Sequence, residues 1–400
     1  MYAMSRITWK FAVLQGLYWI GACVVCSFAE RLLTAYGCSV QQVGLVMAGA
    51  NGAALLLQPL LADLADRADG PSLKSEILGA MALSIVLALF QLFPAARLLT
   101  TALLFGAMSA VTLSIQPMLN AVGFAYVDRG DAIDYSLARG IASAVFAAFC
   151  FLAGYLAEWR LESLLWAYML ANFGILCLSI VFAPGKTRMA KARVPHTGTV
   201  ALLKKHPYLL YFLFGTVLTF ATHNFLNAYM LSIVKTIGKG THEMSAAIAL
   251  AAVLEIPTMA GFSRLMKRFR LESMLLASSV GFTVKHLLLL LPLCFGAGIW
   301  SVYLSQAVQL LGFALFIPAA SFFLNARMDA ADKVKGQMLL TEAQTVGSIL
   351  GQLVGGFGIA RIGIAATMGV GCVLSLIGLA LFWLCVRADR LARKDARRLA

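Results

Sequence analysis

The feature that most constrains this chain is a succession of long apolar segments separated by short polar ones. Twelve segments reach the roughly 20 residues that an α-helix needs to cross a bilayer. They run near residues 10–36, 41–62, 75–95, 98–125, 133–157, 162–183, 208–234, 243–266, 272–294, 297–325, 338–360 and 363–387. With 61% hydrophobic and 12% charged residues, the chain is too apolar for a soluble or an intrinsically disordered protein. The sequence predicts an all-α membrane protein with twelve transmembrane helices.

The longest polar connection divides these segments into two sets of six. It covers residues 185–207 and contains six basic residues. Secondary transporters with parallel repeats are built from two such sets, with their site near the bilayer midplane between the repeats. We therefore expect an N-terminal six-helix half at 1–184, a cytoplasmic central loop at 185–207 and a C-terminal six-helix half with a basic tail at 208–400.

Basic residues are unevenly distributed among the connections. Of the 32 Lys and Arg residues, 24 fall at the two termini, in the central loop and in alternate connections, whereas the other connections hold 6. Cytoplasmic connections carry the excess of Lys and Arg, so we expect a multi-pass protein of the cytoplasmic membrane with both termini inside. The net charge of +14 then reports orientation and not nucleic-acid binding. The expected partners are the lipid bilayer and a small-molecule substrate, and the sequence leaves the oligomeric state open.

Motifs of an enzyme or an ATP-driven pump do not occur in the sequence. Gly185-Lys186-Thr187 resembles the end of a phosphate-binding loop, but Ile180 stands where the first glycine belongs. There is no Gly-x-Ser-x-Gly elbow of a serine hydrolase. We expect no catalytic residue, no metal and no cofactor, and we interpret the chain as a carrier driven by an ion gradient.

Two ionisable residues near the middle of neighbouring segments are the first candidates for a functional site. Glu255 lies in the eighth segment and Lys285 in the ninth. Each is about a dozen residues from the connection that they share, so both side chains reach a comparable depth. A buried charge is costly and usually faces a partner or a cavity. We interpret Glu255 as a proton acceptor or substrate ligand tuned by Lys285; the alternative is a static ion pair that fixes helix packing.

Other polar and aromatic residues inside the segments extend this set of candidates. Arg139 either extends to the cytoplasmic headgroups or binds a substrate hydroxyl or carboxylate, with Asn120 at similar depth as a neutral partner. His223 is either an interior hydrogen bonder or a proton carrier. Trp19 could stack on a sugar ring or simply line the interior.

One stretch carries a family resemblance. Residues 42–67, which contain Gln58-Pro59 and end in Asp66-Arg67, resemble the span-two signature of the major facilitator superfamily. Over nearly the whole chain the sequence is similar to the lactose-permease-like branch of oligosaccharide–proton symporters within that superfamily. The resemblance implies that Asp66 and Arg67 form a cytoplasmic gate, although Ala62 replaces the usual glycine.

The same resemblance implies roles for further residues. The segment from Tyr135 to Ser143 is similar to a motif whose arginine, here Arg139, contacts the sugar; Asn120 falls where that arginine usually has an acidic partner. Glu255 matches the acid of substrate and proton coupling, and Lys285 falls where the family places an arginine.

In the tenth segment, two residues depart from the family pattern. Gln309 and Gly312 stand where lactose permease has the histidine and glutamate of its proton relay. Without that terminal acid, proton symport rests on Glu255 or His223, or the coupling has changed to another ion or to uniport.

The resulting prediction is a secondary active transporter with alternating access. It moves a small polar solute, a sugar or nucleoside-like compound, in symport with H⁺, and Glu255 is the coupling residue. Its substrate-binding residues are predicted to be Arg139, Asn120, Glu255, Lys285, Gln309, His223 and Trp19. An exporter of drugs or cations is a rival that the two positive charges disfavour, and a transport-incompetent sensor of the same fold is another.

Overall fold

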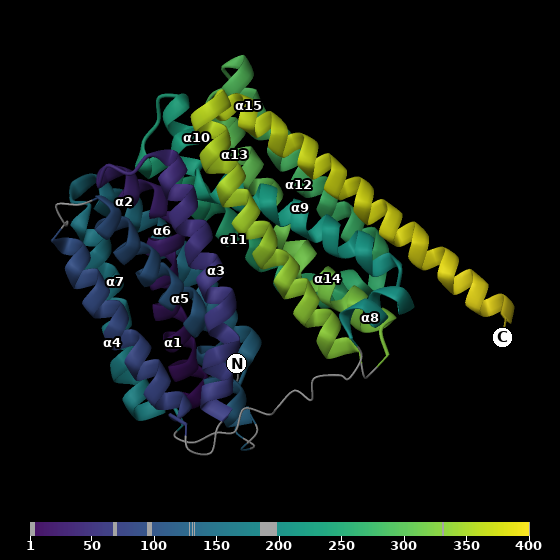
Figure 1. The fold of residues 1–400 in the computed structure, drawn as a ribbon, viewed down its shortest axis with the longest axis horizontal. Helices are drawn as coiled ribbons and strands as arrows, with labels where there is room; N and C mark the ends of the chain where they lie inside the picture. Colours follow the sequence, from purple (N-terminus) through teal and green to yellow (C-terminus); the bar gives the residue numbers. More distant parts are fainter. Residues whose placement is uncertain are drawn as a thin grey trace. The chain divides into compact units, whose positions relative to one another are not determined.

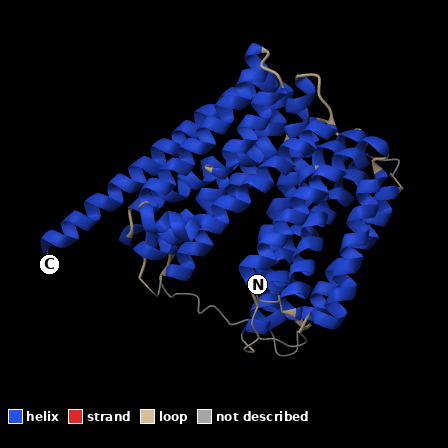
Figure 2. Cartoon of the chain, turned by 180° about the vertical axis from the view of Figure 1, so that it is seen from behind, coloured by secondary structure: helices blue, strands red, loops and turns tan. Residues whose placement is uncertain are grey.

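The computed structural model describes residues 5–66, 70–93, 98–127, 129, 131, 133–184, 198–329 and 332–399. Every regular element among these residues is a helix (Figure 2). Contacts divide the chain into two compact units: residues 1–191 with 228–253, and residues 192–227 with 254–400. The all-helical prediction is therefore confirmed, and the prediction of two halves joined by a loop at 185–207 remains a prediction.

The first unit contains the N-terminal helices and a segment from the second half of the sequence. Its elements are α1 (Arg6–Ala22), the π-helix η1 (Cys23–Ser27), α2 (Ala29–Ala35), α3 (Val40–Asp66), α4 (Leu73–Leu92), α5 (Leu98–Val127), α6 (Tyr135–Trp159), α7 (Glu162–Phe182), α10 (Met230–Thr236) and the first part of α11 (Thr241–Arg268).

The second unit contains the remaining helices. They are α8 (Thr199–Lys205), α9 (Tyr208–Ala228), the rest of α11, α12 (Leu271–Phe295), α13 (Ile299–Ala307), the 3₁₀ turn η2 (Val308–Leu310), α14 (Phe313–Arg327) and α15 (Lys333–Leu399).

Among the described residues, eleven helical stretches are long and apolar enough to span a membrane. The last of them, Lys335–Leu391, has 57 residues and would be about 85 Å long as a straight helix, nearly three times a hydrocarbon core. Gly363, with φ 80° and ψ 166°, interrupts it, and Figure 1 draws the yellow-green and yellow parts of α15 as two separate rods. The break lies where the sequence separates the predicted spans 338–360 and 363–387, so this stretch accounts for two of the twelve predicted spans.

Three predicted spans are not single helices. The first is divided into α1, η1 and α2, the seventh into α9 and α10, and the tenth into α13, η2 and α14.

The first and seventh spans end in similar backbone conformations. In both, a residue outside the helical region (Phe28 or Tyr229) precedes a seven-residue helix, and a glycine with positive φ follows it (Gly37 at 90°, Gly238 at 72°). The equivalent residues lie 201 positions apart in the chain.

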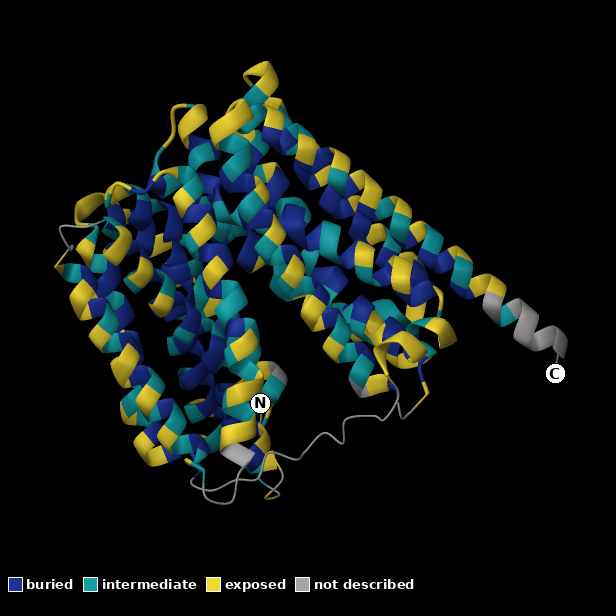
Figure 3. Ribbon diagram, viewed as in Figure 1, coloured by how far each residue is buried: buried dark blue, intermediate teal, exposed yellow. Residues whose placement is uncertain are grey.

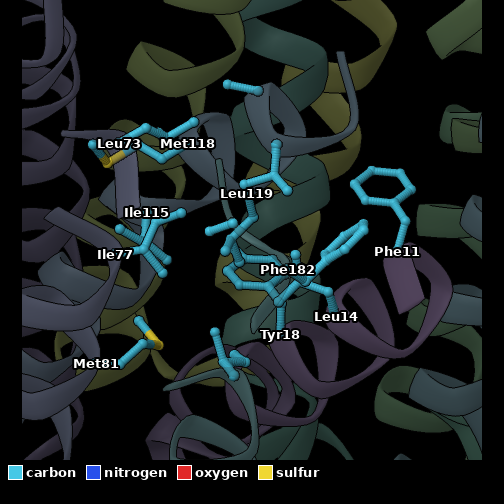
Figure 4. Packing of buried hydrophobic residues seen from close by; sticks show 14 of the residues in the cluster. Phe11, Leu14, Tyr18, Leu73, Ile77, Met81, Ile115, Met118, Leu119 and Phe182 are labelled. Carbon is cyan, nitrogen blue, oxygen red and sulfur yellow. The ribbon is translucent and has the colours of Figure 1, made fainter. Parts of the chain in front are cut away.

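The interior of each unit is built from interlocking apolar side chains. In the first unit, Phe11, Leu14 and Tyr18 of α1 belong to one buried apolar cluster that also contains side chains of α4, α5 and α7 (Figure 4). In the second, Phe212 stacks on Phe323 with ring centroids 5.7 Å apart. Between transmembrane helices such close packing contributes much of the stability, because lipid is as apolar as the side chains.

Glycines allow the closest helix contacts in the second unit. A Cβ on Gly351 of α15 would lie 2.0 Å from the carbonyl oxygen of Ala221, and one on Gly347 would lie 2.6 Å from that of Val217. The four-residue spacing of these glycines places both on the side of α15 that contacts α9. Exposed residues run along the outer faces of the helices (Figure 3). Large apolar side chains are among them, for example Leu56 at 68% and Val181 at 75%, as lipid-facing surfaces require.

Candidate functional site

Three polar side chains from three elements of the second unit form a connected chain. Lys285 of α12 donates a hydrogen bond to Oε1 of Gln309 in η2. The Gln309 Nε2 donates in turn to Oε1 of Glu255 in α11, at 2.8 Å. Lys285 is 1% exposed and Gln309 5%, whereas Glu255 is half-buried. Glu255 and Lys285 therefore belong to one cluster, in which Gln309 connects the carboxylate to the ammonium. We call these three residues the Glu255 cluster.

A close backbone contact holds this cluster together. A Cβ on Gly281 of α12 would lie 2.8 Å from the backbone nitrogen of Gly312 and 3.0 Å from the carbonyl carbon of Leu311. Gly281 is one helical turn before Lys285, and Gly312 follows shortly after Gln309. The absence of a side chain at Gly281 thus allows α12 and the interrupted tenth span to approach closely enough for the lysine to reach the glutamine.

Each of the three side chains has a polar partner within the cluster. An ammonium is a donor only and an ionised carboxylate an acceptor only, whereas an amide side chain is both. Gln309 is therefore the residue type that can join them without a direct ion pair. Glu255 is the least buried member of the cluster, since Lys285 and Gln309 are almost fully buried.

His223 of α9 lies in an aromatic environment of the second unit. Its ring stacks on Phe313 at a centroid distance of 4.9 Å and meets the ring of Phe282 edge-on at 5.5 Å. Its Nε2 is hydrogen-bonded to Nδ2 of Asn227, one turn later, at 3.0 Å. These contacts suit the interpretation as an interior hydrogen bonder; a substrate-binding role for His223 remains a prediction.

A second group of predicted residues lies in the first unit. The Arg139 guanidinium of α6 lies over the indole ring of Trp19 in α1, 4.9 Å from the ring centroid. Phe146 meets the same indole edge-on at 5.8 Å. Both Trp19 and Arg139 are half-buried, so the stacked pair keeps accessible surface. The arginine is held by a cation–π contact, which the sequence did not predict.

Asn120 has a different neighbour from the one expected. Its Oδ1 accepts a hydrogen bond at 3.0 Å from Nε2 of Gln15, a residue of α1 that is 2% exposed. Gln15 is not among the predicted site residues, although an amide within an apolar segment is a signal that points to it. Gln15 lies one turn before Trp19, so α1 supplies both the amide and the indole.

The predicted cytoplasmic gate falls at the end of α3. Asp66 is the last residue of this helix, and Arg67 lies outside the described residues. Their interaction stays a prediction. The described residues contain no group of three or more His, Cys, Asp or Glu side chains that could hold a metal ion.

Comparisons with known proteins relate this architecture to a family. Residues 13–368 match the model of the MFS_1 like family, whereas no curated protein sequence matches the chain. The solved structure of the nucleoside transporter NupG is similar, with 16% identity over 96% of this chain and 99% of that chain and a TM-score of 0.78.

Two further solved structures share the fold. A D-xylose-proton symporter has 12% identity over 95% of this chain and 96% of that chain, with a TM-score of 0.72. A bacterial homolog of the human lysosomal transporter Spinster has 14% identity over 96% and 97%, with a TM-score of 0.66. The family match covers most of the sequence, and the chain therefore belongs to the MFS_1 like family of multi-pass membrane transporters.

Proposed function

We propose that this protein moves a small polar solute, a sugar or a nucleoside-like compound, across the cytoplasmic membrane in symport with a proton. The observation that carries the proposal is the Glu255 cluster, in which a buried lysine is linked through Gln309 to a half-buried carboxylate. A nucleoside transporter and a D-xylose-proton symporter among the similar structures support the solute class.

Glu255 is the proposed proton-binding residue. When ionised, it balances the Lys285 charge through the polarised amide of Gln309, and this arrangement stabilises a charge pair in a medium of low dielectric constant. Proton binding would remove the negative charge and weaken the bond from Gln309, which frees an amide donor for a solute hydroxyl. The solute and the proton would then change the same small network, which is a direct way to couple their binding.

The stacked pair in the first unit is proposed to bind the solute as well. Trp19 offers an aromatic face and Arg139 a planar fork of donors, while Asn120 adds an amide. Sugars and nucleosides present both apolar ring faces and hydroxyl groups, so aromatic and polar partners together suit them. We expect Arg139→Gln to raise the half-saturation concentration for uptake at least tenfold while membrane abundance is unchanged.

The test of proton symport is the pH outside lightly buffered, de-energised cells that express the protein, after pulses of sugars and nucleosides. A transported solute should cause alkalinisation, and Glu255→Gln should reduce it at least tenfold. The matched control is Glu243→Gln, the same substitution in the first turn of the same helix. Alkalinisation that persists in Glu255→Gln would refute the assignment, and solute-driven acidification would indicate export against protons.

The proposed orientation places both termini and α8 in the cytoplasm and the connection between α10 and α11 outside. In a cysteine-free background, an impermeant maleimide should label Lys239→Cys in intact cells. It should label Lys204→Cys only after permeabilisation. The reverse pattern would invert the topology.

A further inference from the structure

A buried carboxyl group outside the Glu255 cluster joins α2 to α10 in the first unit. Glu30 of α2 is 3% exposed, and both of its carboxyl oxygens contact Ser232 of α10. The Ser232 backbone N–H donates to Oε2 at 3.2 Å, and the Ser232 hydroxyl donates to Oε1. We call these two hydrogen bonds the α2–α10 contact.

No ion pair joins Glu30 to a basic side chain in the part of the chain that is described. Within residues 228–253, the charged and titratable groups that interact electrostatically with Glu30 are Lys235 and Tyr229. On α2, Arg31 is its neighbour in the sequence. The predicted first span runs to residue 36, but the candidate span in the structure ends at Ser27, so α2 and Glu30 lie beyond its end. Burial raises the pKa of the Glu30 carboxyl to about 7, although the Ser232 hydrogen bonds and the Lys235 charge lower it.

The contact is compatible with a neutral carboxyl group. A protonated glutamate has a carbonyl oxygen that can accept the backbone N–H and a hydroxyl that can donate to the serine Oγ. Protonation therefore preserves both hydrogen bonds while it removes the cost of keeping a charge away from water. An ionised Glu30 keeps the bonds and bears that cost.

Both helices of the contact are separated from their spans by irregular backbone. The π-helix η1 and Phe28 precede α2, and Tyr229 precedes α10. Breaks of this kind often occur at functional positions, and element-terminal residues are where changes in φ and ψ are absorbed during conformational change. The two short helices can thus separate without unfolding the long helices to which they are attached.

We propose that Glu30 is a proton-binding site distinct from Glu255, and that the proton it binds favours the α2–α10 contact over its opening. This inference rests on the proposed function, because only a transporter that alternates between two arrangements needs this contact to open. With the termini inside, the contact lies on the outer side. Binding of an external proton then favours closure of that side, which is the direction that symport into the cell requires.

The direction of the pH effect follows from linkage. Glu30 binds its proton more tightly in the contact than when solvated, where a glutamate has a pKa of about 4.3. The contact is therefore favoured as the pH falls through about 7 and weakened as the pH rises. Between these two pKa values the ratio of closed to open changes by up to about tenfold per pH unit.

The experiment follows the opening of this contact without any solute. One spin label is placed at Gln42→Cys, near the start of α3 and just after α2, and the other at Lys239→Cys, after α10. The distance between the labels, in a cysteine-free protein in lipid nanodiscs, reports the separation of α2 from α10. Double electron–electron resonance is recorded from pH 5 to 8.5. We expect a short distance at low pH and a long-distance population that grows as the pH rises from 5 towards 7 and levels off above it.

Two variants make the result specific. Glu30→Gln mimics the neutral carboxyl group and should hold the short distance at every pH, whereas the control Glu243→Gln should keep the pH dependence. A single distance in the native sequence at all pH values, or an unchanged pH dependence in Glu30→Gln, would overturn the proposal. The readout is independent of transport, so a pH-dependent distance combined with undiminished symport in Glu255→Gln would retain the Glu30 site and reject the Glu255 assignment.

Discussion

At the scale of single residues, the most informative side chain is Lys285. A lysine that is 1% exposed inside an apolar helix needs compensation, because an isolated buried ammonium is very costly. Here the compensation is indirect: an amide oxygen of Gln309 accepts its hydrogen bond, and that amide is oriented by Glu255. The amide is thus a structural requirement of the cluster as well as a potential solute ligand.

This arrangement predicts that Gln309→Leu is destabilising. It leaves the Lys285 amine buried without its acceptor, a loss of about 1–3 kcal/mol. The double variant Lys285→Met with Gln309→Leu should recover most of that loss, because apolar groups then replace both partners of the hydrogen bond. Thermal unfolding of the purified protein, followed by tryptophan fluorescence at one scan rate, measures the comparison. A double variant no more stable than Gln309→Leu would show that the bond contributes little.

Residue types and depth predicted part of this site. Antiparallel neighbouring spans with residues at equal distance from one connection place Glu255 and Lys285 in one region, and that inference needs only the helix rise. The position of Gln309 between them depends on the 3₁₀ turn η2, in which this residue lies. The stacking of Arg139 on Trp19 depends on the packing of α1 against α6, and residue spacing in the sequence does not predict which helices pack together.

At the scale of elements, hydropathy located the spans but not their interruptions. An apolar segment stays apolar whether its backbone is an α-helix, a π-helix or a 3₁₀ turn, so the breaks at Cys23–Ser27 and Val308–Leu310 leave no mark in the hydropathy pattern. Tertiary contacts specify them, as the approach of Gly281 to Gly312 illustrates. The break near Gly363 was easier to predict, because the apolar stretch that contains it is far longer than a single span needs.

The close approach of Gly281 predicts a sensitive element. Gly281→Ala should separate α12 from the interrupted tenth span, lower stability by about 1–3 kcal/mol through overpacking, and reduce uptake because Lys285 and Gln309 move apart. Gly261→Ala is the matched control: it is also within a helix, but an added Cβ there has no atom within 4 Å. The control should be neutral or slightly stabilising, since alanine favours helix over glycine by up to about 1 kcal/mol. Equal behaviour of the two variants in unfolding and uptake assays would argue against a role for this contact.

At the scale of the whole molecule, the segment 228–253 clusters with residues 1–191 although it belongs to the second half of the sequence. Glu30 contacts α10, and α6 contacts the start of α11, where a Cβ on Gly154 would lie 1.9 Å from Oγ of Ser245. Nearby, the Tyr155 hydroxyl is hydrogen-bonded to Nε2 of His242 at 3.1 Å. In a carrier with two alternating arrangements, contacts of this kind have to form and break once in every cycle.

A covalent link across one of these contacts should therefore stop transport. Tyr155 is exposed and His242 half-buried, with ring centroids 4.1 Å apart, so cysteines at both positions are within reach of a short bifunctional thiol reagent. In a cysteine-free background, cross-linking of Tyr155→Cys with His242→Cys should abolish net solute uptake, and a reductant that cleaves the reagent should restore it. Each single-cysteine variant, treated in the same way, should retain uptake because the reagent then joins nothing. Full uptake by a population shown to be cross-linked would mean that α6 and α11 stay in contact throughout the cycle, and the moving contacts would then have to be sought elsewhere.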